Sequence, residues 1–483
     1  MRVERRLLGN VAVLGAGEFV AQLANFLFVI IIARAFGPEL LGHYSLSMAV
    51  TAIVVVFVSF GTIQLHVRNI GRNADDGGQL LRTLFPVQVG LAIVAWIAIV
   101  SAGVLSQLGA TEVGLLAAIA GYQILVRMTG ILLTEPKGRQ QMNPVAVVHA
   151  GTPILILCVA SILLWMNSGP LAALWVMPVC AFIFAIYAAR TAIRLGGPLR
   201  SRWDAGAFVG GLKQARPYFA VMLLTSAYER LGVIILGIFA SRVVVGEFAA
   251  GERIVAALGV LISVVTTAAL PALSSLAAND KSRLIQVANR LIRVAWLVSL
   301  PVASVISLFS AEIIHLVFGE AYAGSSIVLA IASILLVIRA IRAVLAPMAM
   351  ATGRPGDLAL ARAAALVALV FGAPFLITWY GAKGLAGTMV LSEVILLTVL
   401  SSRLAAAGYL PRLIGPALRV IGACGAAIAV GLYGVGWPLL PRVAATLTVG
   451  LLGLWMFRAI RTADIQFFLD LARKKNPPDA NVK

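Results

Sequence analysis

The chain has 483 residues, of which 61% are hydrophobic and only 12% are charged, and its mean hydropathy is +1.00. A soluble globular domain carries about a quarter charged residues, so this composition excludes a soluble protein. The formal net charge of +19 does not indicate a nucleic-acid-binding protein, because the basic residues lie in short loops between apolar runs, where membrane topology explains them.

Apolar runs of about 20 residues, the length that crosses a bilayer, recur along the whole chain. The basic N-terminus resembles the start of a signal peptide, but no small-residue cleavage site follows, so we predict an uncleaved first span. The sequence therefore predicts an all-α polytopic membrane protein with about fourteen transmembrane helices. We expect spans at 11–33, 44–66, 84–106, 113–133, 145–166, 171–190, 217–240, 247–270, 288–309, 326–350, 358–380, 384–403, 413–433 and 440–458.

The charges of the loops support this count. With both termini in the cytoplasm, most of the 38 Lys and Arg residues fall in cytoplasmic segments. Losing one helix would invert every later loop and destroy this bias. The outside loops then hold only Arg34, Arg242, Lys383 and Arg442.

The longest extramembrane stretch, at 195–216, is basic and contains Trp203, which predicts a cytoplasmic linker lying on an anionic leaflet. It divides the chain into predicted parts. These are a six-helix lobe at 1–194, the linker, a second six-helix lobe at 217–405, two extra transmembrane helices at 406–460 and a cytoplasmic tail at 461–483.

The two halves resemble each other at one place. Gly42-His43-Tyr44 aligns with Gly246-Glu247-Phe248, and each triplet lies where one long span ends and the next begins. Six spans separate the copies, and an even number predicts a parallel repeat with its axis along the membrane normal. Two unrelated loops that share a Gly-aromatic pair remain the alternative.

Apart from the basic residues near span ends, which we count with the loops, five arginines lie inside predicted spans, where a charge is costly and indicates function. Arg339 and Arg342 share a helix face near the middle of one span. Two guanidinium groups on one face suit a diphosphate, which they bind bidentately. The alternative is that they pair with acidic residues between helices, and we expect Glu393 to pair with an arginine.

The other three arginines have weaker patterns. Arg230 is next to Glu229 in mid-span, and adjacent helical residues point in different directions, so each needs its own partner. Arg127 lies nearer the cytoplasmic end of its span and Arg253 nearer the outside. Each of the two either contacts substrate in a cavity or extends to the interface.

Glu18, Gln22 and Asn25 form a polar stripe on the first span, which is too costly to face lipid. The stripe lines a cavity or gate, or makes hydrogen bonds to other helices. Glu18 is also a candidate for proton or sodium coupling. His66 and His149 lie near span ends, where a histidine is usually interfacial. The three cysteines sit in apolar runs without metal-binding spacing, so no metal or cofactor is expected.

Ala33 to Tyr44 (ARAFGPELLGHY) resembles the first outside loop of Wzx-type polysaccharide-transport flippases, and the stretches Gly246 to Arg253 and Ala346 to Gly353 also look like that family. The resemblance covers essentially the whole chain, but sister families share these motifs. It implies two six-helix bundles around a central cavity, plus two further helices.

The resemblance also implies a function. The substrate would be an undecaprenyl-diphosphate-linked oligosaccharide, moved from the cytoplasmic to the outer leaflet of a bacterial inner membrane by alternating access, with membrane lipids, a polymerase and chain-length proteins as partners. Lipid II flippases and, less closely, multidrug antiporters are the alternatives. No enzymatic motif stands in a credible context, and the short outside loops disfavour a polymerase.

Overall fold

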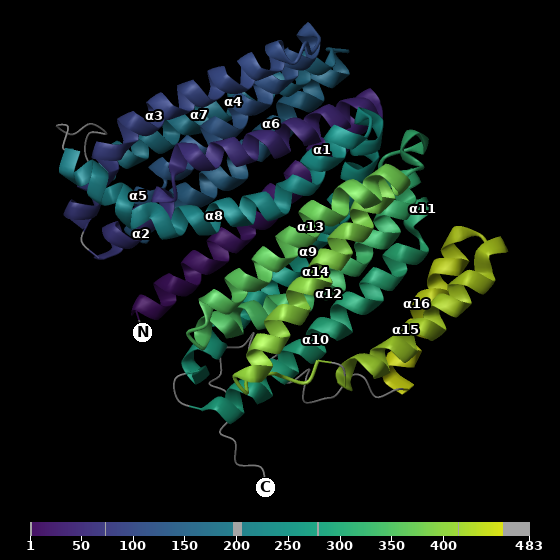
Figure 1. Ribbon diagram of the computed structural model, residues 1–483. Helices are drawn as coiled ribbons and strands as arrows, with labels where there is room; N and C mark the ends of the chain where they lie inside the picture. The colour runs from purple at the N-terminus through teal and green to yellow at the C-terminus, as the bar shows by residue number, and fades with distance from the viewer. Residues whose placement is uncertain (1, 73, 197–204, 278–279, 414, 457–483) are drawn as a thin grey trace. The chain divides into compact units, whose positions relative to one another are not determined.

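The computed structural model describes residues 2–72, 74–196, 205–277, 280–413 and 415–456. Almost all of them are helical, and none of these residues forms a strand (Figure 1). The predicted tail at 461–483 and residues 197–204 of the predicted linker lie outside this range. The main helices are α1 (Arg2–Ser59), α3 (Ala74–Leu105), α4 (Ala110–Leu132), α6 (Asn143–Trp165), α7 (Pro170–Gly196), α8 (Ala205–Phe239), α9 (Arg242–Ala277), α10 (Lys281–Leu308), α12 (Ser325–Ala351), α13 (Pro355–Tyr380), α14 (Ala382–Ala406), α15 (Gly415–Tyr433) and α16 (Leu439–Met456). The short ones are α2 (Thr62–Arg72), α5 (Thr134–Gly138) and α11 (Ser310–Val317), with 3-10 turns at Glu320–Tyr322 and Gly434–Gly436.

These helices account for about fourteen membrane crossings. Among the described residues, ten helices are long and apolar enough to span a bilayer. The longest of them covers 43 residues and is two spans in one, because Gly37 (φ 80°, ψ −178°) kinks α1 in front of Pro38. Helix α9 and the shorter apolar helices at 418–433 and 439–453 supply the rest. The predicted all-α polytopic fold is confirmed.

The second predicted span differs from the structure at its end. We predicted that it runs to residue 66, whereas α1 ends at Ser59, and Phe60 and Gly61 both have positive φ. A Cβ at Gly61 would collide with the backbone of Phe219 in α8, so glycine permits this close approach. The chain then resumes as the amphipathic helix α2.

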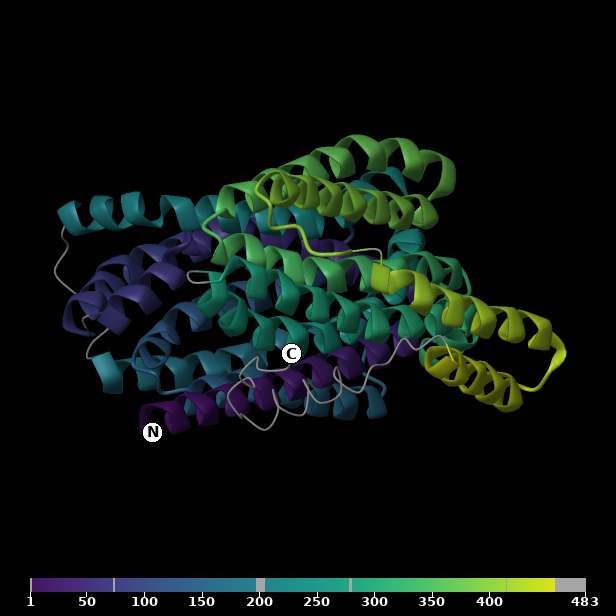
Figure 2. The ribbon, with the colours of Figure 1, turned by 90° about the horizontal axis from the view of Figure 1, so that it is seen from below.

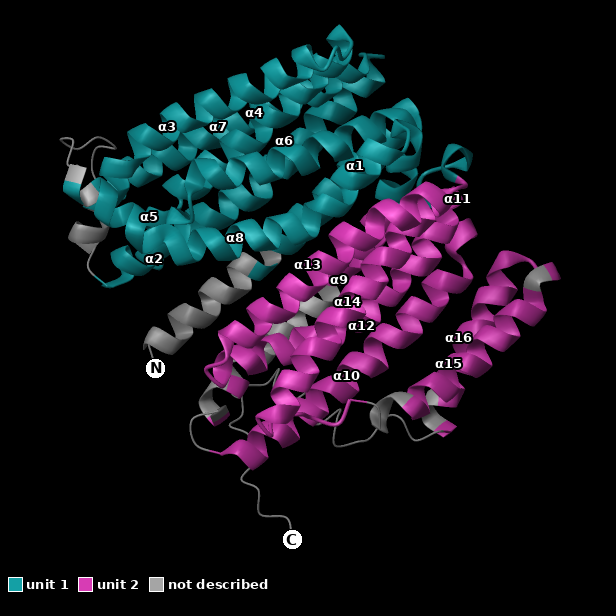
Figure 3. Cartoon of the chain, in the orientation of Figure 1, with its two compact units in different colours: residues 1–250, 317–322 teal, residues 251–316, 323–483 magenta. Residues whose placement is uncertain are grey.

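Contacts divide the chain into two compact units (Figure 3). Unit 1 comprises residues 1–250 and 317–322, and unit 2 comprises residues 251–316 and 323–483. Two hydrogen bonds connect the short segment at 317–322 to the rest of unit 1. The Tyr322 hydroxyl donates to the Ala33 carbonyl (3.1 Å), and Arg34 Nε donates to the Val317 carbonyl (2.9 Å). The lobe boundaries proposed from the sequence stay a prediction.

Within unit 1 the two copies of the sequence repeat lie against each other. A Cβ at Gly42 would overlap the carbonyl oxygen of Arg242, and a Cβ at Gly246 would overlap the carbonyl oxygen of Pro38. Pro38 and Gly42 precede Arg242 and Gly246 by the same 204 residues. The start of the second span and the start of α9 therefore cross in a reciprocal contact, which we call the glycine crossing. Small residues allow such close backbone packing in membranes.

Unit 2 is built around α12. In the most apolar 18-residue stretch of this helix, 61% of the residues are buried inside the protein. The last two helices, α15 and α16, form an antiparallel hairpin (Figure 2). Val420, Ala423 and Cys424 of α15 pack against Trp296 and its neighbours on α10. At the other end of the hairpin, Arg442 donates to the Gly431 carbonyl (2.8 Å) and to Glu312 of α11 (2.7 Å). The hairpin is thus attached to the α10–α11 region at both ends.

Candidate functional site

The strongest candidate site lies inside unit 2, on α12 and α14. Arg339 Nε is 3.4 Å from Glu393 Oε1, and Arg342 Nε is 3.1 Å from Glu393 Oε2. The i, i+3 spacing on α12 brings both guanidinium groups to one carboxylate on α14. Glu393 is almost fully buried, whereas each arginine side chain is 25% exposed. The expected pairing of Glu393 with an arginine is confirmed, and one carboxylate serves two cations.

The charges of this cluster do not cancel. Two guanidinium groups face one carboxylate, which leaves one positive charge in excess. The Arg342 contact is electrostatic, because Arg342 Nε and Glu393 Oε2 are close but not aligned as a hydrogen bond. Both arginines use Nε for the contact, so their terminal nitrogens remain available to another anion. The geometry can therefore hold the helices together and still bind a phosphate.

Arg253, on α9 of unit 2, is half-buried and has no hydrogen-bond or ion-pair partner among the residues that the structure describes. In unit 1, Arg127 of α4 is half-buried, and its one polar contact is with the sulfur of Met222 on α8 (3.7 Å). Arg230 and Glu229 of α8 are exposed, and within the described part of the chain neither has a partner. The five arginines are thus divided between the units and do not form one cluster within either.

The polar stripe of α1 is in unit 1. Gln22 Nε2 donates to Glu18 Oε1 (3.1 Å), and Glu18 Oε2 lies 3.5 Å from Nδ1 of His149 on α6. Asn25 lies one turn further along and is half-buried. Glu18 and His149 are both well exposed (54% and 40%). The stripe therefore makes a contact between helices and still presents polar groups at a surface of the unit, so both interpretations from the sequence remain open.

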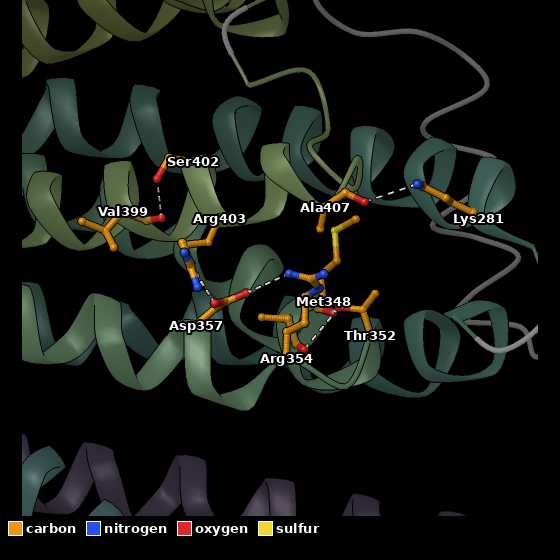
Figure 4. A network of polar contacts seen from close by, with 10 residues as sticks. Lys281, Met348, Thr352, Arg354, Asp357, Val399, Ser402, Arg403 and Ala407 are labelled. Carbon is orange, nitrogen blue, oxygen red and sulfur yellow. Dashed lines mark hydrogen bonds and ion pairs between the residues drawn. The ribbon is translucent and has the colours of Figure 1, made fainter.

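Sequence reasoning missed several ion pairs. In one, Asp357 at the start of α13 joins Arg354 (3.3 Å) and Arg403 of α14 (2.9 Å), as Figure 4 shows. The spacing of Arg354 and Asp357 was a usable local signal, but Arg403 is distant in sequence. Further ion pairs are Arg139–Glu135 (2.8 Å) and Arg442–Glu312 (2.7 Å), and His43 Nε2 lies 3.2 Å from Glu112, a contact that is ionic only when His43 is protonated.

His66 corrects a further expectation. We predicted an interfacial histidine, but its side chain on α2 is fully buried, and neither ring nitrogen has a hydrogen-bond partner among the described residues. Burial without a partner disfavours the charged imidazolium and lowers the pKa of His66 to about 3. His66 is therefore a neutral core residue. It is buried because α2 turns back onto the helices of unit 1.

Comparison with protein families gives one match. The model of the family described as "Polysaccharide biosynthesis protein" matches residues 7–277, which is more than half of the chain. No curated protein matches the chain.

Solved structures share the fold at low sequence identity. The lipid II flippase MurJ in an inward closed conformation aligns with a TM-score of 0.75 at 13% identity, over 95% of this chain and 99% of that one. A MOP superfamily transporter from Pyrococcus furiosus aligns with a TM-score of 0.60 at 16% identity, over 83% of this chain and 96% of that one. The MATE transporter VcmN of Vibrio cholerae, as a point mutant, aligns with a TM-score of 0.55 at 17% identity, over 83% of this chain and 97% of that one. The fold is that of membrane flippases and transporters.

Proposed function

Because this chain belongs to the family of polysaccharide biosynthesis proteins, we propose that it carries undecaprenyl-diphosphate-linked oligosaccharides from the cytoplasmic to the outer leaflet of a bacterial inner membrane. Both termini lie in the cytoplasm, which agrees with the distribution of loop charges. The protein acts by alternating access, exposing a headgroup site first to the cytoplasm and then to the outside. It supplies a polymerase and chain-length proteins with their substrate.

The observation that carries this proposal is the excess positive charge at Arg339 and Arg342. An isolated charge inside a membrane protein is costly, and a purely structural contact would be neutral. Here Glu393 balances only one of the two arginines. A diphosphate supplies the missing negative charge and accepts hydrogen bonds from the terminal guanidinium nitrogens. Arg253, Arg230 and Arg127 are further candidates for contacts with the headgroup, and Glu18, Gln22, Asn25 and Glu229 for gate lining or ion coupling.

The test uses export of surface polysaccharide in a cell that lacks its own flippase. The double variant Arg339→Gln/Arg342→Gln should abolish export while the protein remains in the membrane at its normal level. Arg354→Gln/Arg403→Gln is a matched control, because these arginines also share one carboxylate, that of Asp357. Undiminished export by the first variant, or equal loss in both at equal protein levels, would contradict the site.

A lipid II flippase is the second candidate, since its substrate presents the same prenyl diphosphate and the MurJ fold aligns with 95% of this chain. Depletion of the host's lipid II flippase separates the two functions. Restored growth on expression of this chain would make lipid II its substrate, and failure to restore growth together with restored polysaccharide export supports the oligosaccharide. A multidrug antiporter would instead export cations, which the positive charge beside Glu393 disfavours.

A further inference from the structure

Unit 1 contains a pocket of about 350 Å³ that none of the functions considered above uses. It lies between the second half of α1, the end of α3, the start of α4 and the first residue of α9. Its deeper walls are apolar and include Val50, Val54, Ala98, Ile99, Ala102 and Leu116. The polar residues of its lining are His43, Ser47, Ser106, Glu112 and Arg242, all of which lie toward the helix ends.

One polar residue of the pocket lining, Arg242, favours binding of an anion. Glu112 is already engaged, since it contacts His43 Nε2 (3.2 Å) and accepts from the backbone N–H of Gly109 (3.2 Å). Arg242 donates through one terminal nitrogen to the Gly237 carbonyl (2.9 Å), and its remaining N–H groups have no partner within the described ranges. Arg242 is also the first residue of α9, so the partial positive charge of a helix N-terminus adds to its own.

The depth of the pocket matches one leaflet of a bilayer. His43 and Val54 are eleven residues apart on one helix, which corresponds to about 16 Å at 1.5 Å per residue. Half the hydrocarbon core of a membrane is about 15 Å thick. The polar groups lie at the helix ends, and the apolar walls extend from there toward the middle of the span.

We propose that this pocket holds an acyl chain of a membrane phospholipid, with the lipid phosphate at Arg242. In the orientation proposed above, the lipid comes from the outer leaflet. The site is separate from Arg339 and Arg342 and does not depend on which substrate is carried. It adjoins the glycine crossing, because His43 follows Gly42 and the carbonyl of Arg242 touches Gly42. A bound lipid therefore stabilises the crossing.

The proposal is tested by native mass spectrometry of the purified full-length protein with added palmitoyl-oleoyl-phosphatidylglycerol. We expect one phospholipid to be retained tightly, and the same chains as diacylglycerol, without phosphate, to bind at least tenfold more weakly. Ala102→Phe, which fills the pocket, should weaken phospholipid binding at least tenfold, and Arg242→Gln should weaken it three- to tenfold. The controls are Ala172→Phe at an exposed position of α7 and Lys383→Gln on α14, neither of which lines the pocket.

Photo-crosslinking gives a second readout if Ala102→Phe fails to fold. A phospholipid with a diazirine in its acyl chain should label peptides 43–54 and 98–116 preferentially in the unaltered protein. Labelling spread evenly over the apolar surface, or binding unchanged in Ala102→Phe, would overturn the pocket. Equal binding of diacylglycerol would overturn the role of Arg242 as a phosphate ligand. None of these outcomes bears on polysaccharide export, so this inference and the proposed function fail independently.

Discussion

Gly42 lies directly against the carbonyl oxygen of Arg242, with no room for a side chain between the two backbones. The same relation holds between Gly246 and the carbonyl of Pro38, and the two contacts are related by the internal repeat. The obstacle to any larger residue is main chain, which cannot move aside as a flexible side chain would. The two spans therefore cross at these glycines with their backbones in direct contact.

Replacing Gly42 by alanine should destabilise unit 1, because the added methyl group overlaps a backbone oxygen. Overpacking of a tight contact costs about 1–3 kcal/mol. The measurement is the thermal unfolding midpoint in detergent, which should fall by several degrees. Gly90→Ala in α3 is the control, since nothing lies near its added Cβ and alanine favours the helix. An equal unfolding midpoint for Gly42→Ala and the control would show that the two backbones can separate to admit a methyl group without loss of stability.

Replacing Glu393 by glutamine should leave two arginines facing each other without a carboxylate. Loss of one partner from a fully buried pair costs about 3–5 kcal/mol, and roughly 2 kcal/mol is expected here because the arginines are a quarter exposed. Chemical unfolding measures this difference. The triple variant with Arg339→Gln and Arg342→Gln should recover most of the loss. No recovery would mean that Glu393 stabilises unit 2 through contacts other than this charge.

The neutral state of His66 predicts a pH dependence of stability. Its pKa is about 3 when folded and near 6.5 when unfolded, so between these values only the unfolded chain takes up the proton. Stability is therefore lost as the pH falls below 6.5, by about 2 kcal/mol at pH 5. His66→Met should remove this loss and be neutral or stabilising at pH 7.5. Unfolding midpoints at the two pH values test it, and an unchanged pH dependence in His66→Met would assign the effect to other groups.

Arg442 should control the attachment of the C-terminal hairpin. Its side chain is nearly buried, lies over the ring of Phe309 and donates to both Gly431 and Glu312. Arg442→Gln breaks these contacts and should loosen α15 from α10. The readout is the rate at which a maleimide labels Cys424, which is buried in that contact, with exposed Cys158 as internal reference. We expect at least a fivefold faster reaction at Cys424 in the variant, and equal rates in both proteins would contradict the prediction.

The sequence was a good guide to the helices for a physical reason. Each span must be apolar over about 20 residues, so hydropathy alone locates it. The break at Gly61 could not be predicted in this way, since it depends on backbone dihedrals and on the approach of Phe219, which hydropathy does not report. The burial of His66 was missed for the same reason.

The candidate site was only partly predictable. Helical spacing places Arg339 and Arg342 on one face, and the cost of a lone buried carboxylate makes an arginine partner for Glu393 the natural expectation. That a single carboxylate serves both arginines follows from the packing of α12 on α14, which no local pattern encodes. The meeting of Glu18 with His149 likewise depends on the packing of α1 against α6.

The kink at Gly37 has a mechanical consequence for the first two spans. They are joined by a single residue with positive φ and not by a loop, so the chain has no slack between them. A tilt of the first span therefore either tilts the second span with it or is absorbed by a change in the backbone dihedrals of Gly37. Insertion of a few flexible residues at Gly37 would uncouple the two spans without altering any side chain in either.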